Sequence, residues 1–184
     1  MNTFERIIKR AFDFTLALVS LIFFSPLIAL IALLIKWEDS KGDVIYRQER
    51  IGYKGKPFTL YKFRSMRMDA EAGNRPQLFT DGDSRLTKVG AFIRAHHLDE
   101  FPQLWNVIKG EMSFVGPRPE RQFFIDQIME RNPDYVRLYA VRPGLFSYAT
   151  LYNGYTDTIE KMLERLRLDL EYLDNYSHFT DDKI

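Results

Sequence analysis

The chain has 184 residues, a length typical of one domain or of one domain plus an anchor. Its 26 lysines and arginines nearly balance its 25 aspartates and glutamates, so bulk charge argues against a dedicated nucleic-acid-binding protein. It contains no cysteine, which excludes disulfides, thiol nucleophiles and thiolate metal sites.

An uncharged apolar run extends over residues 14–35. At 22 positions it is long enough to cross a bilayer as a helix. Basic residues flank both ends, so the flanking charge does not favour opposite sides of a membrane. Ser25 and Pro26 lie at its middle, where a proline removes one helix hydrogen bond and clashes with the preceding turn. We therefore expect a bent, re-entrant membrane helix over residues 1–36; the alternatives are a straight span and a buried helix of a soluble core.

A bend at membrane depth leaves backbone carbonyl groups that must be satisfied within the protein. The hydroxyls of Ser20 and Ser25 are the candidates for this role. Trp37 follows the apolar run directly and is expected at the membrane–water boundary.

Residues 37–184 are predicted to form one compact domain with amphipathic interfacial helices. The hydrophobic periodicity indicates a mostly α-helical fold with a small β element, an α+β class. Short strands are expected at 44–48 and 58–63, joined by a glycine-containing turn, and a polar loop at 69–84. Helices are expected at 86–97, 100–109, 120–130 and 159–173, the second of them ended by Gly110.

Asp99 and Glu100 are adjacent carboxylates at the expected start of the helix at 100–109. One interpretation is structural, because aspartate is a common N-cap and a glutamate behind it complements the helix dipole. The other is catalytic, because the same dipole keeps Asp99 ionised, as a carboxylate nucleophile must be. Two neighbouring carboxylates also suit a hard cation such as Mg²⁺. The two residues alone leave both interpretations open.

Arg118 lies between two prolines in the segment 116–119, which fixes the backbone on both sides of its guanidinium. A planar donor group held in this way can bind phosphate oxygens in bidentate fashion. Arg142, in the segment 141–144, is followed by a proline in a similar arrangement. For both, the alternative is a solvated arginine in an extended connector. Further basic candidates for phosphate binding, each of which alone fits a surface charge, are Lys62, Arg64 and Arg94.

His96 and His97 precede the carboxylate pair. On a helix, neighbouring side chains point about 100° apart, so these two are poorly placed to share one metal ion. The chain has no glycine-rich loop of the phosphate-binding or dinucleotide type and no serine nucleophile elbow. Trp105 is expected in the core.

Seven segments spread over nearly the whole chain form a specific combination. They are residues 9–13 (KRAFD), 25–26 (SP), 48–52 (QERIG), 61–66 (YKFRSM), 98–106 (LDEFPQLWN), 112–119 (MSFVGPRP) and 141–144 (VRPG). Together they resemble the bacterial sugar transferase family, the small monotopic phosphoglycosyl transferases that begin lipid-linked glycan assembly.

The resemblance implies transfer of a sugar-1-phosphate from a UDP-sugar to a polyprenol phosphate such as undecaprenyl phosphate, with release of UMP. This is the first membrane step of capsule, O-antigen or glycoprotein glycan assembly. In such enzymes the first residue of the Asp-Glu pair attacks the β-phosphate and forms a covalent phosphosugar intermediate. By that analogy Asp99 is the nucleophile and Glu100 helps to hold Mg²⁺. Arg118 would bind the phosphate, with Arg94 and Arg142 as further phosphate-side candidates.

The resemblance also implies a location. The N-terminal helix would be re-entrant, with both ends on the cytoplasmic face of the bacterial inner membrane, and residues 37–184 would be a cytoplasmic catalytic domain. The expected partners are the UDP-sugar, the polyprenol phosphate and membrane lipid, without nucleic acid; a homodimer is left open.

The chain departs from the family pattern in two places. His96 and His97 stand where relatives usually have a small hydroxyl residue. Residues 145–155 replace a glycine-rich segment that ends in Gln-Val-Asn-Gly-Arg, and Tyr155 stands at the position of its basic residue. If this loop touches the nucleotide or the sugar, the departure leaves the choice of donor sugar open but not the chemistry.

Two other functions are compatible with parts of the sequence. One is a catalytically inactive membrane scaffold, although such a protein has no reason to keep Asp99, Glu100 and Arg118 together. The other is a lipid phosphatase or hydrolase that uses the same aspartate with water as the acceptor.

Overall fold

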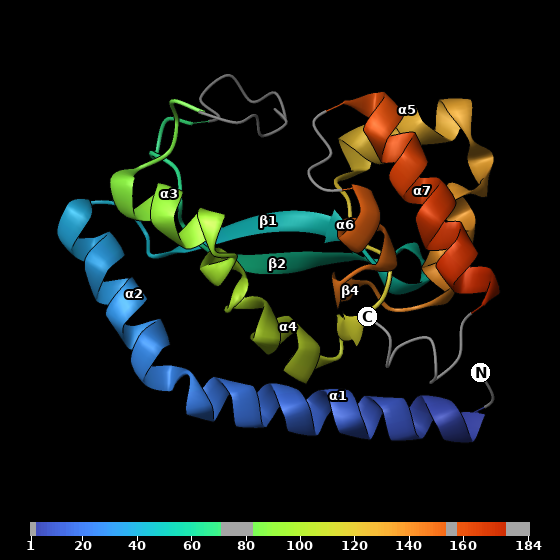
Figure 1. The fold of residues 1–184 in the computed structure, drawn as a ribbon, viewed down its shortest axis with the longest axis horizontal. Helices are drawn as coiled ribbons and strands as arrows, with labels where there is room; N and C mark the ends of the chain where they lie inside the picture. Colours follow the sequence, from blue (N-terminus) through green and yellow to red (C-terminus); the bar gives the residue numbers. More distant parts are fainter. Residues whose placement is uncertain (1–2, 71–82, 154–157, 176–184) are drawn as a thin grey trace.

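The computed structural model describes residues 3–70, 83–153 and 158–175. Helices predominate and surround a small antiparallel ribbon, so the predicted mostly α-helical α+β class is confirmed (Figure 1). Most of the polar loop expected at 69–84, and Tyr155 in the divergent loop, lie outside the described residues.

The N-terminal segment forms two helices, α1 (Thr3–Phe23) and α2 (Ser25–Glu38). No described helix is long and apolar enough to cross a membrane alone, whereas this pair, bent by 61° at its junction, has the length and composition to do so. Pro26 lies in the first turn of α2, where its missing N–H breaks no helix bond. The Ser25 hydroxyl donates to the Ile22 carbonyl at 2.7 Å. The bend expected at Ser25 and Pro26 is therefore confirmed, and one of the two candidate hydroxyls satisfies a carbonyl there.

One face of α1 packs against the rest of the molecule, which lies above it in Figure 1. The Arg10 guanidinium donates to the carbonyls of Val107 and Ile108, both at 2.6 Å. The buried Asp13 carboxylate accepts from the Ser113 hydroxyl at 2.8 Å and from the Phe114 N–H at 3.2 Å. The charged pair of the KRAFD segment thus attaches the helix to the domain.

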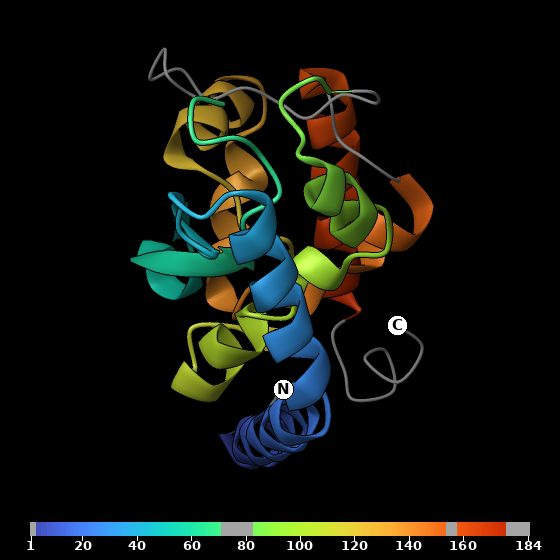
Figure 2. The same cartoon turned by 90° about the vertical axis from the view of Figure 1, so that its left-hand side faces the viewer.

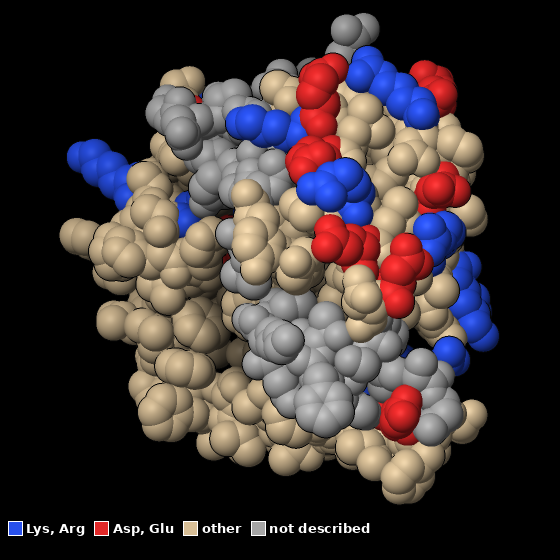
Figure 3. All heavy atoms as spheres, turned by 45° about the vertical axis from the view of Figure 1, so that its right-hand side comes forward, with Lys and Arg blue, Asp and Glu red and all other residues tan. Residues whose placement is uncertain are grey.

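The other faces of α1 and α2 carry exposed apolar side chains. They include Phe4, Ile8, Phe12, Val19, Phe23, Leu30, Leu33 and Trp37. Figure 3 shows charged side chains gathered over the C-terminal helices, whereas the lower left part of that face is uncharged. Figure 2 shows α2 rising from the end of α1 at the front of that view, and exposed apolar side chains lie on both of these helices.

The antiparallel ribbon consists of β1 (Ile45–Ile51) and β2 (Pro57–Phe63), close to the two predicted strands. Its register pairs Ile45 with Phe63 and Ile51 with Pro57, and the short helix η1 (Tyr53–Gly55) closes the turn. A second, parallel pair joins β3 (Ser113–Val115) to β4 (Gly144–Phe146), which the sequence pattern did not predict. A Cβ atom on Gly144 would lie 2.2 Å from the Gly116 nitrogen, so this close approach requires glycine.

The predicted helices are present with small shifts at their ends. They are α3 (Lys88–Ala95), α4 (Gln103–Lys109), α5 (Gln122–Arg131) and α7 (Ile159–Asp174). The elements η2 (Leu98–Glu100), η3 (Pro133–Ala140) and α6 (Tyr148–Asn153) were not predicted. Gly110 ends α4 with φ 80°, as expected of a C-terminal glycine.

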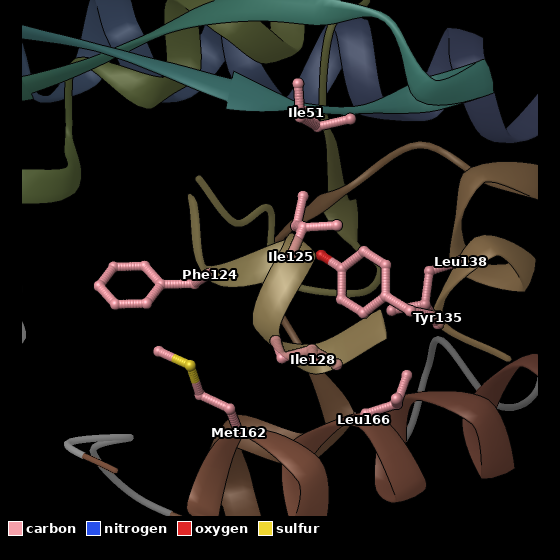
Figure 4. Close-up of a cluster of buried hydrophobic side chains, with 8 residues drawn as sticks. All are labelled: Ile51, Phe124, Ile125, Ile128, Tyr135, Leu138, Met162 and Leu166. Carbon is pink, nitrogen blue, oxygen red and sulfur yellow. The ribbon is translucent and has the colours of Figure 1, made fainter. Parts of the chain in front are cut away.

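The C-terminal helices enclose the largest of three apolar clusters, shown in Figure 4. Its buried members are Ile51, Phe124, Ile125, Ile128, Tyr135, Leu138, Met162 and Leu166. A second cluster joins α1 to β2 and α4, and a third joins α2 to β2 and α3. The ribbon therefore contacts all three clusters and links the bent helix pair to the domain.

The expectation that Trp105 lies in the core is wrong. Its side chain is 52% exposed, while its neighbours Leu104, Asn106 and Val107 are buried. A short helix buries one face only, and on α4 that face belongs to these neighbours.

Candidate active site

Asp99 and Glu100 lie in η2, a single 3₁₀ turn between α3 and α4 that contacts β2. His97 adopts the left-handed conformation with φ 55°, which ends α3 and redirects the chain. The Glu100 N–H donates to the His97 carbonyl at 3.2 Å and closes the turn. The pair thus lies at the start of a helical segment, as expected, but in a 3₁₀ turn, and α4 itself begins three residues later, at Gln103.

Glu100 lies between two cations from distant parts of the chain. Its Oε1 accepts from Lys62 Nζ on β2 at 2.8 Å and from Arg118 Nη2 at 2.6 Å. Burial opposes its ionisation, but these two charges outweigh the effect and lower its pKa well below the usual range. Glu100 is therefore ionised, and its two ion pairs hold Lys62 and Arg118 next to the carboxylate pair.

Asp99 has a different environment. Its side chain is 3% exposed, and it makes no hydrogen bond or ion pair with any described residue. Burial, together with the charge of Glu100, raises the pKa of Asp99, while Lys62, Arg94 and Arg118 oppose that rise. Among the charged groups around it, these three cations favour the ionised form of Asp99. The expected contribution of a helix dipole stays a prediction.

The arginine between the two prolines lies in a loop that the parallel strand pair supports. The Gly144 N–H donates to the Pro117 carbonyl at 2.9 Å, and the Ile51 N–H donates to the Glu120 carbonyl at 3.0 Å. These bonds fix the loop on both sides of Arg118. Because the flanking prolines also restrict the backbone, the Arg118 side chain is held toward Glu100 with little freedom to lose.

Behind this loop lies a second buried cluster of charges. Glu120 accepts from Arg165 of α7 at 2.8 Å and pairs with Arg50 of β1. These cations lower the pKa of Glu120 to about 2. Asp169, also on α7, faces the Arg118 N–H, and burial raises its pKa to about 6. The cluster connects the C-terminal helices to the arginine loop.

The carboxylate pair is suited to Mg²⁺. Both cations bind Oε1 of Glu100, and its Oε2 accepts no hydrogen bond from the described residues. Asp99 adds a second carboxylate, which accepts no hydrogen bond from the part of the chain that the structure describes. Within the described ranges no group of three or more acidic or histidine residues could form a complete protein site. Mg²⁺ is typically held by one or two carboxylates together with substrate phosphates, so the residues present fit this ion.

The structure separates the five basic candidates into two groups. Lys62, Arg94 and Arg118 surround the carboxylate pair. Arg64 lies beyond the end of β2, where it donates to the Asp39 carboxylate at 2.5 Å and the Asp39 carbonyl at 3.2 Å. Arg142 donates to the Gly110 carbonyl at 2.9 Å, at the C-terminal end of α4. Neither of these two arginines bonds to the carboxylate pair.

The sequence reasoning missed the buried charges of Arg50, Glu120, Arg165 and Asp169. A signal was present in α7, where Arg165 and Asp169 occupy the helical face defined by Met162 and Leu166. Charged residues at core positions of an amphipathic helix are seldom left unpaired. They therefore indicate partners elsewhere in the fold, although the pattern does not identify them.

Comparison with known proteins adds a family match. The model of the bacterial sugar transferase family matches residues 4–184, almost the whole chain.

Three relatives illustrate the similarity. The chain is 42% identical over 182 residues to the UDP-glucose:undecaprenyl-phosphate glucose-1-phosphate transferase of Escherichia coli K12, covering 98% of this chain and 39% of that protein. It is 40% identical over 174 residues to the UDP-N-acetylgalactosamine-undecaprenyl-phosphate N-acetylgalactosaminephosphotransferase of Aeromonas hydrophila, covering 95% and 41%. A third, the exopolysaccharide production protein PSS of Rhizobium leguminosarum, is 38% identical over 185 residues, covering 98% and 92%. The chain thus spans about two fifths of the length of the first two.

Proposed function

Because the chain belongs to the bacterial sugar transferase family, we propose that it transfers a sugar-1-phosphate from a UDP-sugar to polyprenol phosphate and releases UMP. The names of two relatives support both substrate classes, since each names a UDP-sugar and undecaprenyl phosphate. The reaction would be the first membrane step in the assembly of a bacterial glycoconjugate.

The observation that carries the proposal is the state of Asp99. This carboxylate is almost buried, has no hydrogen-bond partner among the described residues and lies near three cations. A buried carboxylate without a partner is costly to keep ionised, so its retention beside an ion-paired glutamate indicates a chemical role. A purely structural aspartate would be hydrogen-bonded, as Asp13 is.

In the proposed reaction an Asp99 carboxylate oxygen attacks the β-phosphorus of the UDP-sugar. The bond from this phosphorus to the bridging oxygen of the diphosphate breaks, and UMP leaves with the electron pair of that bond. The sugar phosphate is then joined to Asp99 as an acyl phosphate. A phosphate oxygen of the polyprenol phosphate next attacks the same phosphorus, which forms the lipid diphosphate-sugar and returns Asp99 as a carboxylate. Covalent catalysis of this kind gives ping-pong kinetics.

The neighbouring residues act on charge and position. Arg118 donates through Nη2 to Glu100. The other N–H groups of its guanidinium therefore remain to bind phosphate oxygens. Lys62 and Arg94 add positive charge near Asp99, which favours its ionised, nucleophilic form and offsets the charge of an incoming diphosphate. Mg²⁺, held by Asp99 and Glu100, would neutralise the diphosphate and stabilise the leaving phosphate.

We also propose that α1 and α2 form a re-entrant anchor, with residues 37–184 as the catalytic domain on the cytoplasmic face of the bacterial inner membrane. The 61° bend and the exposed apolar side chains of both helices support this arrangement. Replacing Pro26 with Leu should straighten the anchor and move one end across the membrane. Labelling of single cysteines placed before and after the anchor measures this; labelling of both from the same side would mean that Pro26 does not set the topology.

The test of the reaction is UMP release by the detergent-solubilised protein with Mg²⁺ and a panel of UDP-sugars. Release over many turnovers is expected to require undecaprenyl phosphate. Without the lipid, at most one UMP per protein should be released, with radiolabelled sugar phosphate retained on the protein. Release of UMP and free sugar phosphate without the lipid would instead show a hydrolase. Folded protein that releases no UMP with any donor would favour the inactive scaffold.

A further inference from the structure

A cavity of about 50 Å³ lies between the first half of α1 and the segment before β4. Four basic residues line it, Arg6, Lys9 and Arg10 of α1 and Arg142, with Asp13 as the acidic residue. A water molecule needs on the order of 10–15 Å³ of such space, so the cavity can hold several waters or a group such as a phosphate.

The cations in this cavity are only partly engaged by the protein. Arg142 bonds through Nε to the Gly110 carbonyl at 2.9 Å, and its guanidinium lies 5.4 Å from the centre of the Tyr53 ring. Its two terminal amino groups make no hydrogen bond with any described residue. Arg6 has no ion pair or hydrogen bond within the described ranges. Arg142 thus presents two terminal amino groups whose position is set by the Nε bond, and Arg6 adds a second cation without a partner among the described residues.

The charges around the cavity are unbalanced. The carboxylate of Asp13 already accepts from Ser113 and Phe114, and the Arg10 guanidinium is close enough to Arg142 for the two positive charges to repel each other. Like charges held together in a partly buried site favour an anion between or beside them. An anionic ligand would therefore relieve an electrostatic conflict that the described residues leave in place.

The position of the cavity indicates where such an anion comes from. Residues 6, 9, 10 and 13 share one face of α1, which is directed at the domain. The opposite face exposes Phe4, Ile8 and Phe12. If that apolar face lies in the membrane boundary, the cavity is about one helix diameter, roughly 10 Å, above it. This is the level of lipid headgroups.

We propose that this cavity is a binding site for the phosphate group of an anionic membrane lipid headgroup, held by Arg142 and Arg6. The site is separate from the carboxylate pair, because neither Asp99 nor Glu100 lines the cavity. It would hold α1 and the domain together at the membrane surface. The inference concerns lipid binding and holds whether or not Asp99 is a nucleophile.

The test is a titration of the detergent-solubilised full chain with short-chain phosphatidylglycerol, followed by native mass spectrometry and calorimetry. The double variant Arg6→Gln/Arg142→Gln is expected to bind this lipid at least tenfold more weakly. The matched control is Lys41→Gln/Arg47→Gln, which removes the same charge from exposed positions outside the cavity and should bind like the wild type. Equal binding by the Arg6/Arg142 variant, or an equal loss in the control, would overturn the proposal.

Two further measurements distinguish a lipid headgroup from free phosphate and from the phosphate of the acceptor. Inorganic phosphate should compete only weakly; competition as strong as that of the lipid would show a site for free phosphate instead. If the Arg6/Arg142 variant keeps phosphatidylglycerol binding but loses UMP release that depends on undecaprenyl phosphate, the cavity serves the acceptor and the proposal is wrong. Arg6→Gln alone removes no bond to the described residues, so it keeps the test valid if loss of the Arg142–Gly110 bond unfolds the protein.

Discussion

Glu100 and Glu120 have the same local arrangement, a carboxylate that pairs with two cations from other elements. Glu100 lies between Lys62 and Arg118, and Glu120 lies between Arg50 and Arg165. The cations lower the pKa of both glutamates, that of Glu120 to about 2. One loop connects the two clusters, because it carries Arg118 and, two residues later, Glu120.

The clusters also share a second feature. Each contains a buried aspartate whose pKa is raised by burial, Asp99 in the first and Asp169 in the second. They differ in the hydrogen bonds of this aspartate: Asp169 accepts from the Ser147 hydroxyl and from the N–H groups of Arg118 and Ala149, whereas Asp99 accepts none from the described residues. Perturbed pKa values occur in both clusters, so perturbation alone does not distinguish a site from a structural network. The absence of any hydrogen bond to the Asp99 carboxylate from the described residues does.

Asp99→Asn should give the largest effect on rate and little effect on stability. Removal of the nucleophile is expected to lower turnover on the order of 10⁴–10⁶-fold. The melting temperature at pH 7–8 should be equal to or above that of the wild type, because burial penalises the ionised aspartate, and a neutral amide avoids this penalty. UMP release and thermal unfolding in detergent measure the two properties. Full activity of this variant would contradict the covalent mechanism.

Arg118→Ala should lower turnover by about 10²–10³-fold, the range seen when one donor to a developing charge is removed. Arg118→Lys restores the charge without the planar donor pair, so it should recover only part of the rate. Steady-state kinetics of the two variants separate the contribution of charge from that of bidentate geometry. Equal rates for Ala, Lys and Arg would mean that this side chain does not bind the reacting phosphate.

Glu120→Gln should act in the opposite way to Asp99→Asn and lower stability by about 3–5 kcal/mol, because Arg50 and Arg165 are left buried without a counter-charge. The stabilisation is present above the ordinary glutamate pKa and is lost as pH falls toward about 2. Chemical denaturation at pH 7 and at low pH measures both effects. Glu164→Gln, on the exposed face of α7, is the control and should leave unfolding unchanged.

Arg94→Gln should give the smallest effect, a shift in pH dependence. Arg94 favours the ionised form of Asp99, so its removal raises the pKa of Asp99 further, and the low-pH limb of the rate profile should move to higher pH. Single-turnover rates between pH 4 and 8 measure the shift. Arg47→Gln removes an exposed charge on β1 and should leave the profile in place. A shift to lower pH in Arg94→Gln would contradict this electrostatic assignment.

The sequence by itself determined the elements and the main candidates. Proline, glycine and apolar periodicity act within a few residues, so they predicted the bend at Ser25 and Pro26, the two ribbon strands, four helices and the stop at Gly110. The same local patterns singled out Asp99, Glu100 and Arg118. They failed at η2, where the left-handed His97 ends one helix and delays the next, because a histidine gives no glycine-like signal for that conformation.

Tertiary structure alone decided which candidates act together. It brought Lys62, Arg94 and Arg118 around the carboxylate pair and placed Arg64 and Arg142 elsewhere, although the sequence made all five candidates for phosphate binding. It also set the pKa of Asp99 through burial and paired Glu120 with a helix 45 residues away. Burial and long-range charge pairing depend on the packing of distant segments, and no pattern within one segment contains that information.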